Sequence, residues 1–326
     1  MSTVFRISTP ADAVAVAVAF VRYLPEHEMV VFAPHAPSAG VMICHMGAEL
    51  PAEGLPLVLP CGHPVRDVRG PRLVVVFGSD AHAEVAARIV GREFPDDEVM
   101  VVQFHQGCAR RYSVDGVEPY TVGEQVDLAA HPYVVGEVVD GRVRLASRDQ
   151  IRAGFAPEQF GAESAGRVAE MMCAARAAFP AVSALSAAET VHREALAGYL
   201  EQSGERGIEI SDYHAAMLAA AASDVRVRDV LFIHFTETNA AALGELWRQV
   251  GSMLPARDAG PAFVLASLSY WIAREAVPAR EAMNIARKLD PEHSLGQLLE
   301  RAYDAGAHPA LCEQIRPAAY EMESEQ

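Results

Sequence analysis

One short run of apolar residues, mostly valine, constrains the fold of this chain more than any other feature. Leu73 to Phe77 is bounded by Pro71 and Gly78, and a run of this length and composition is typical of a strand covered on both faces. An amphipathic segment over residues 81–91 follows, and a second valine-rich run begins at Val99. This strand–helix–strand order predicts two parallel neighbours in a sheet. The residues expected in its core are Leu73, Val74, Val75, Val76 and Val101.

Another helix and two more strands are predicted before this unit. Thr9-Pro10-Ala11-Asp12 provides a hydroxyl cap, a proline at the first helical position and an acid at the third, so a helix should run to about Tyr23. The alanine–valine alternation of this segment alone favours a strand, and the cap decides for a helix. Residues 28–32 and 40–46 are short apolar runs that predict buried strands.

Two Asp-Gly pairs predict hairpins after the valine-rich unit. Asp115-Gly116 lies within residues 111–120, and Asp140-Gly141 separates apolar runs over residues 134–139 and 142–146. An Asp-Gly pair between apolar runs is typical of the tight turns that join antiparallel strands. The N-terminal half is therefore predicted to be α/β, with a mixed, partly parallel sheet and covering helices.

The hydrophobic period changes near residue 155, where the strand signals end and helical spacing takes over. We therefore predict two domains, an α/β domain over residues 1–155 and an all-α domain over residues 156–326. Ser186 and Ser211 are predicted to cap two of the helices. The helices expected in the second domain cover residues 186–203, 211–222, 225–235, 239–253, 261–274, 278–289 and 294–304.

The last three of these helices alternate small and large residues, which is typical of a tetratricopeptide-like helical hairpin. A single unit is not an array, so ordinary helix packing and a peptide-binding groove both stay open. Val264, Leu268 and Trp271 share one helical face, which predicts that Trp271 points inward and that Tyr270 is partly exposed. A groove would lie beside three arginines, namely Arg274, Arg280 and Arg287.

Charge and composition argue against several functional classes. The 326 residues include 43 acids and 27 bases, for a net charge of −16, which argues against a nucleic-acid binder and against an anionic membrane surface. Lys288 is the sole lysine, and no Gly-x-x-x-x-Gly-Lys run contains it, so P-loop and most Schiff-base chemistry lack their amine. The apolar runs are too short to span a bilayer, and five scattered cysteines are typical of reduced thiols, so we expect a cytoplasmic protein.

Several segments in order resemble one family. They are Tyr23 to Val31, Arg226 to Asp229, Leu246-Trp247, Pro261 to Trp271 and Asp290 to Leu295. Together they resemble the actinobacterial family catalogued as domain of unknown function 4192, most closely over residues 224–309. The resemblance implies an architecture and an actinobacterial source. It implies no activity, because the family has none established.

One family element is altered in this chain and also forms a candidate site. The family's Gly-Arg-Trp-Trp-Ser-Tyr element falls on residues 109–114, where Arg110 and Ser113 match and Arg111 and Tyr112 replace the two tryptophans. Two arginines beside a tyrosine can hold a phosphate or a carboxylate. The same residues also fit an exposed hairpin strand with no such role.

A second candidate site lies where the predicted parallel strands end. Ligands of open parallel sheets bind beyond the carboxyl ends of the strands, where Gly78-Ser79-Asp80 and His105 are predicted to lie. Backbone N–H groups at the start of the next helix can receive an anion. The alternative is that Ser79 or Asp80 simply caps that helix.

Cysteines and histidines of the first half raise the question of zinc, which needs four converging ligands. Cys44 and His45 are adjacent on a predicted strand and point to opposite faces, and the sequence has no Cys-x-x-Cys pair. We therefore predict no bound metal and no cofactor, and leave the zinc alternative open. The residues concerned are Cys44, His45, Cys61, His63, His105 and Cys108.

These observations favour a cytoplasmic binding or scaffold protein over an enzyme, because no catalytic motif stands out. The α/β half would hold a small anionic ligand, and the helical half would bind a protein partner. The alternative is a hydrolase or a nucleotide-modifying enzyme with a site at the strand ends near Ser79, Asp80 and His105, in which His105 acts as base.

Overall fold

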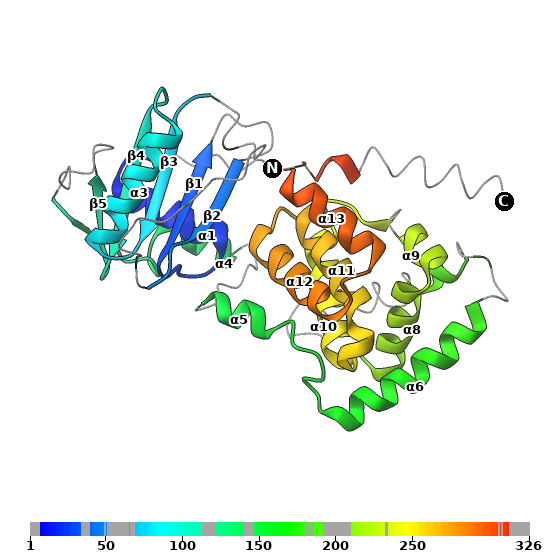
Figure 1. The fold of residues 1–326 in the computed structure, drawn as a ribbon. Coiled ribbons are helices and arrows are strands. Elements are labelled where there is room, and N and C mark those ends of the chain that lie inside the picture. Colours follow the sequence, from blue (N-terminus) through cyan, green and yellow to red (C-terminus); the bar gives the residue numbers. More distant parts are fainter. Residues whose placement is uncertain are drawn as a thin grey trace. The chain divides into compact units, whose positions relative to one another are not determined.

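The computed structural model describes most of the chain, in two compact units. One unit comprises Met1–Arg148 with Asp304–Gly306, and the other comprises Asp149–Tyr303 with Ala307–Gln326. Figure 1 shows strands in the first unit and helices throughout the second. The described residues are 7–33, 40–48, 50, 65, 69–112, 122–139, 147–179, 183, 186–191, 210–231, 234–305, 307 and 309–312.

The first unit is built on a sheet with strand order β2-β1-β3-β4-β5-β6. The strands β3 and β4 are parallel, and every other neighbouring pair in this order is antiparallel. The predicted mixed, partly parallel sheet is therefore confirmed. The strands are β1 (Glu28–Ala33), β2 (Gly40–His45), β3 (Arg72–Phe77), β4 (Val99–His105), β5 (Cys108–Tyr112) and β6 (Glu124–Gln125).

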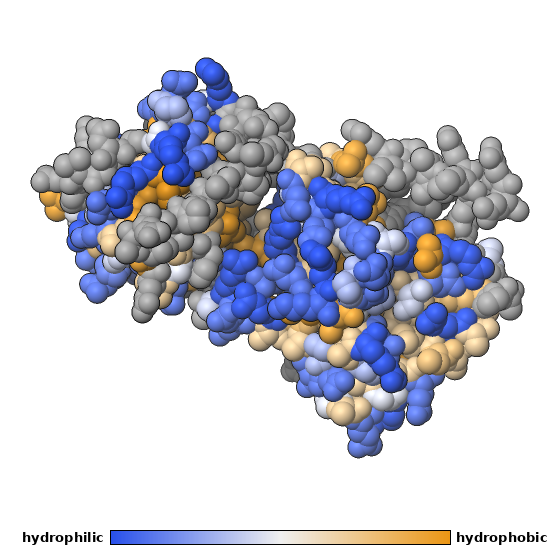
Figure 2. Space-filling model, in the orientation of Figure 1, coloured by the Kyte–Doolittle hydropathy of each residue, from blue (hydrophilic) through white to orange (hydrophobic). Residues whose placement is uncertain are grey.

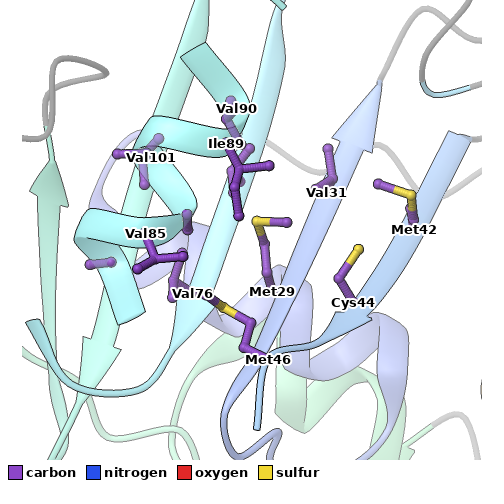
Figure 3. Packing of buried hydrophobic residues seen from close by; sticks show 14 of the residues in the cluster. Met29, Val31, Met42, Cys44, Met46, Val76, Val85, Ile89, Val90 and Val101 are labelled. Carbon is purple, nitrogen blue, oxygen red and sulfur yellow. The ribbon is translucent and has the colours of Figure 1, made fainter. Parts of the chain in front are cut away.

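The valine-rich strand β3 lies in the middle of this sheet, as predicted. Val74, Val75 and Val76 are fully buried, because helix α3 (Asp80–Glu93) covers one face and α1 (Pro10–Val21) covers the other. Figure 3 shows the core on the α3 side, where Val85 and Ile89 meet the side chains of the strands. Burial on both faces explains why β3 is apolar at every position after Arg72.

Two local signals near the start of the sheet have different outcomes. The helix predicted after Thr9 is confirmed, since Thr9 and Asp12 form a reciprocal capping box at the start of α1. The strand predicted over residues 134–139 is wrong, because Pro132–Val139 forms helix α4. Pro132 suits the first helical position, and α4 packs against α1, so tertiary packing overrides the apolar pattern.

The tight turn after β4 was not predicted. Gln106 and Gly107 both have positive φ angles, of 49° and 77°, and join β4 to β5 as a two-residue hairpin loop. The hairpin predicted around Asp115-Gly116 and the turn at Asp140-Gly141 lie outside the described residues. Glycine at the second loop position was the available signal, with glutamine in place of the usual asparagine.

The second unit contains helices and no strand among its described residues. The predicted cap at Ser211 is confirmed, because its hydroxyl accepts from the backbone N–H of His214. One helix starts five residues earlier than predicted, at Ala256, and contains Pro261. Residues 186–191 are also helical. The helices with full bounds are α5 (Arg148–Ala153), α6 (Ala162–Ala178), α8 (Asp212–Ser223), α9 (Val225–Leu231), α10 (Ala240–Met253), α11 (Ala256–Ile272), α12 (Ala276–Leu289) and α13 (Ser294–Asp304).

The prediction for the adjacent aromatic residues of α11 is wrong. Tyr270 is buried and Trp271 is partly exposed, the reverse of the expectation. The reason is a pairing between α10 and α11: a Cβ at Gly244 would lie 2.7 Å from the Tyr270 ring, and one at Gly251 would lie 2.4 Å from the Phe263 ring. Glycines seven residues apart on α10 therefore receive rings seven residues apart on α11.

Within the part of the chain that the structure describes, no helix is long and apolar enough to cross a membrane.

Candidate functional site

The strand ends of the parallel pair gather a polar cluster on the α3 side of the sheet. The backbone N–H of Gly78 donates to the carbonyl oxygen of Phe104 over 3.1 Å, so the chain leaves β3 beside the end of β4. Val76 pairs with Gln103 in the register, which places Gln103 next to the turn that starts α3. The predicted meeting of two strand ends therefore exists as a local geometry.

Asp80 is the centre of this cluster. The Gln103 side-chain amide donates to the Asp80 carboxylate over 2.9 Å and to the Gly78 carbonyl oxygen over 3.0 Å. Arg110 lies 3.9 Å from the same carboxylate, and the Tyr112 side chain is close enough to lower its pKa. Gln103 is 1% exposed, whereas the Asp80 side chain is 70% exposed. A buried amide thus fixes a carboxylate that still faces solvent.

The electrostatics of the cluster follow from these contacts. The Gln103 hydrogen bond lowers the pKa of Asp80, with further lowering from Tyr112, Arg110 and His105. Burial raises the pKa of Tyr112, and the nearby Asp80 carboxylate raises it further. A hydrogen bond with Cys108 raises the pKa of Arg110. The site therefore presents one fixed negative group and one permanent positive group at neutral pH.

The predicted residues separate into three environments. Asp80, Arg110, Tyr112 and His105 belong to the cluster, with His105 at the exposed end of β4. Arg111 alternates to the other side of β5, where its guanidinium donates to the Met100 sulfur over 3.2 Å. Arg110 and Arg111 therefore do not act together on one ligand.

Ser79 turns away from the cluster. It occupies the N-cap position of α3, as the capping alternative requires, yet its side chain makes no cap hydrogen bond. Its hydroxyl lies 2.8 Å from Nδ1 of His82 instead. The histidine partner of Ser79 is thus His82, one turn along α3, and not His105.

No group of three or more histidine, cysteine or acidic side chains among the described residues is placed to hold a metal. Cys44 is buried, and burial raises the pKa of its thiol to about 11, which disfavours the thiolate that zinc needs. Cys61, His63 and the side chain of His45 lie outside the described residues. The zinc alternative rests on those positions.

The helical unit carries an open hollow of about 540 Å³ between α5 and α12. Among its lining residues, Glu281 is fully buried, and its carboxylate accepts from Nε of Arg152 over 3.0 Å. Of the three arginines predicted to flank a groove, Arg287 lines this hollow, Arg274 pairs with Glu237, and Arg280 covers the Tyr303 ring. The lining residues are Arg152, Glu281, Asn284, Ile285, Arg287 and Lys288.

Comparison with known families decides the relationship suggested by the sequence. A family model described as "Domain of unknown function (DUF4192)" matches residues 10–310. The chain belongs to this family. No curated protein and no solved structure matches it. Both the polar cluster and the hollow fall inside the span that the DUF4192 model covers.

Two polar residues near the strand ends of this DUF4192 chain were not predicted from the sequence, namely Gln103 in the cluster and His82 beside Ser79. Gln103 is the polar member of a valine-rich strand, at a position that faces α3 together with Val101. A polar side chain on the buried face of a strand needs a partner, and that was an available signal. His82 is three residues after Ser79, a spacing that places both on one helix face.

The lowered pKa of Asp80 predicts how the stability of the folded protein depends on acidic pH. The unfolded chain has the ordinary Asp80 pKa of 3.8, and the folded value is lower. The stability linked to Asp80 is therefore fully present above pH 3.8 and is lost as the pH falls through the folded pKa. We expect Gln103→Leu to move the Asp80 pKa back towards 3.8, as measured by NMR titration of the carboxyl carbon. An unchanged titration would show that Gln103 does not hold the carboxylate.

Proposed function

We propose that the chain is a cytoplasmic binding protein whose α/β unit holds a small polar ligand with an anionic group. The observation that carries the proposal is the preorganised cluster around Asp80 at the carboxyl ends of the parallel strands. Cys44, Cys108 and Cys173 form no disulfide in the part of the chain that the structure describes, which supports a reducing compartment. The abundance of arginine over lysine supports the actinobacterial source.

The roles of the groups follow from their charges. Arg110 is 3.9 Å from Asp80, longer than a hydrogen bond, so the donors that its contact with Cys108 leaves over are available to a phosphate or carboxylate. His105, which also acts electrostatically on Asp80, lies at the exposed end of β4 in the same cluster. The exposed carboxylate of Asp80 would accept a hydrogen bond from a hydroxyl or amine of the ligand. The site therefore favours a ligand that combines an anion with a hydrogen-bond donor.

Binding is tested with the purified full chain. Native mass spectrometry reports a co-purifying ligand, and calorimetric titration with inorganic phosphate tests the anion subsite. Arg110→Gln should weaken phosphate binding at least about tenfold, since hydrogen bonds to charged groups contribute about 1.5–3 kcal/mol. Arg88→Gln, on the exposed face of α3, is the matched control and should bind as the unchanged protein does. Absence of any ligand and of phosphate binding would remove the proposal.

We further propose a protein partner for the helical unit, including a tetratricopeptide-like hairpin formed by α11 and α12. The specific support is the hollow beside α12, which holds Lys288, with Arg287 next to it in an ion pair with Glu300. Figure 2 shows hydrophilic residues gathered over α12 and α13. This surface favours a charged partner segment, one rich in carboxylates, over an apolar one.

Charge reversal tests this surface. Lys288→Glu should abolish recovery of a partner from a cell extract, because the added carboxylate repels an acidic segment. Arg301→Glu changes charge equally on the exposed side of α13 and serves as the control. Equal recovery by both variants would place the partner elsewhere.

A further inference from the structure

A serine–histidine pair at the start of α3 has a geometry that the binding role does not require. The Ser79 hydroxyl oxygen lies 2.8 Å from Nδ1 of His82, and Nε2 of His82 lies 2.9 Å from the carbonyl oxygen of Gly47. A carbonyl oxygen can only accept, so Nε2 carries the proton of the neutral ring and Nδ1 is the acceptor. The Ser79 hydroxyl therefore donates to His82, as a serine does to its general base.

The imidazole ring is held firmly in this orientation. His82 is 4% exposed, and its ring lies against that of His27, with centroids 4.9 Å apart and the ring planes tilted by 31°. A Cβ at Gly78 would lie 2.8 Å from Cγ of His82, so glycine at this position makes room for the ring. A base fixed by packing on one side and by a carbonyl oxygen on the other is preorganised for proton transfer.

The same spacing elsewhere in the chain gives an ordinary helix cap. Ser211 also lies 2.9 Å from Nδ1 of its histidine, His214, but its hydroxyl accepts from the backbone N–H of His214 over 3.2 Å. Ser79 occupies the equivalent position of α3 and makes no cap hydrogen bond. The Ser79 hydroxyl is thus committed to the ring and not to the helix.

The surroundings of Ser79 complete the parts that acyl transfer needs. Ser79 is partly exposed, so a substrate can reach it. The backbone N–H groups of Asp80 and Ala81 are the first two of α3 and have no partner within the helix. N–H groups at a helix N-terminus favour negative charge, so these two would stabilise charge that develops next to Ser79.

We propose that Ser79 is the nucleophile of an acyl-transfer site that hydrolyses small carboxylic esters, with His82 as its general base. This goes beyond the binding role of the Asp80 cluster. The Ser79 oxygen bonds to the ester carbonyl carbon, and its proton moves to Nδ1 of His82. That proton passes to the departing alkoxide as the ester C–O bond breaks. A water molecule then attacks the acyl-serine carbonyl carbon while His82 accepts its proton. The proton returns to the Ser79 oxygen as the acid is released, with no change of oxidation state.

Covalent labelling tests the proposal on the full chain. A fluorophosphonate probe should phosphonylate Ser79 with loss of fluoride, and peptide mass spectrometry should place the adduct on that residue. Ser79→Ala should lose the adduct and the hydrolysis of p-nitrophenyl acetate. His82→Gln should slow both by about 10²–10⁴-fold, the range for loss of a general base. Ser211→Ala is the matched control and should react as the unchanged protein does.

An unlabelled Ser79 in the unchanged protein, or hydrolysis by Ser79→Ala at the unchanged rate, would overturn the proposal. If His82→Gln fails to fold, Ser79→Ala decides, because that substitution removes no cap hydrogen bond. Failure here is separate from failure of the binding role, since phosphate binding is tested at Arg110 and labelling is tested at Ser79.

Discussion

Arg148→Met should destabilise the α/β unit by about 3–5 kcal/mol, because it leaves a buried carboxylate without its cation. Glu28 on β1 is 2% exposed, and its carboxylate accepts from Nη1 of Arg148 over 3.1 Å. The hydroxyl of Tyr23 donates to the other carboxylate oxygen. We expect the lower end of the range, since the Arg148 side chain is 29% exposed and water can partly replace it.

Hydrogen exchange of the β1 and β3 amides in increasing urea measures this effect. Both tryptophans lie in the helical unit, so tryptophan fluorescence does not report on the sheet. The control is the same substitution in a Glu28→Gln background, where a neutral amide replaces the carboxylate. There Arg148→Met should cost less than half as much, by the logic of a double-mutant cycle. An equal cost in both backgrounds would mean that Arg148 stabilises through packing of its stem alone.

The α/β fold was predictable where one local signal had no competitor. The β3 run of valines has few stable positions in a soluble protein except the middle of a sheet, and the capping box at Thr9 decided α1 against its own alternation. The segment over Pro132–Val139 failed because its apolar pattern fits a strand and a helix equally. There the contact with α1 selects the helix, and a local sequence pattern does not predict a contact between distant segments.

The location of the candidate site was predictable from the sequence, but the side-chain contacts within it were not. The strand ends put Ser79, Asp80 and His105 in one region, as the topology of a parallel pair requires. The partners of these residues depend on the register of β3 with β4, which brings Gln103 to Asp80, and on the alternation along β5, which separates Arg111 from Arg110. Spacing along the chain alone does not fix a register between strands.

The adjacent aromatic residues Tyr270 and Trp271 of α11 also show that contacts between elements are not fixed by a local pattern. Val264, Leu268 and Trp271 do share a face, and Val264 and Leu268 are fully buried. Tyr270 is nevertheless the buried aromatic residue, because Gly244 on α10 leaves room for its ring and its hydroxyl donates to the Glu245 carboxylate over 3.2 Å. The sequence signal for a buried Tyr270 was the matching seven-residue spacing of two glycines on α10 and two aromatic rings on α11.

Combining Gly251→Ala with Phe263→Ala should cost less than the sum of the two single substitutions. Phe263 is fully buried and packs edge-on against Phe155, so Phe263→Ala alone should cost about 3–5 kcal/mol through the cavity it leaves. Gly251→Ala alone should cost about 1–3 kcal/mol, since its methyl group would lie 2.4 Å from the Phe263 ring. With the ring removed, the methyl group has space and fills part of the cavity.

Urea unfolding followed by fluorescence of Trp247 and Trp271 measures this cycle, because both report on the helical unit. Gly166→Ala in α6 is the matched control: a Cβ there has no neighbour within 4 Å, so the substitution should be neutral or stabilise by up to about 1 kcal/mol. We expect the effects of the Gly251 and Phe263 substitutions to be coupled because the added methyl group and the Phe263 ring would occupy the same space. Simple additivity would therefore show that α10 and α11 can move apart to accept the methyl group, and that the glycine is not what brings these helices close.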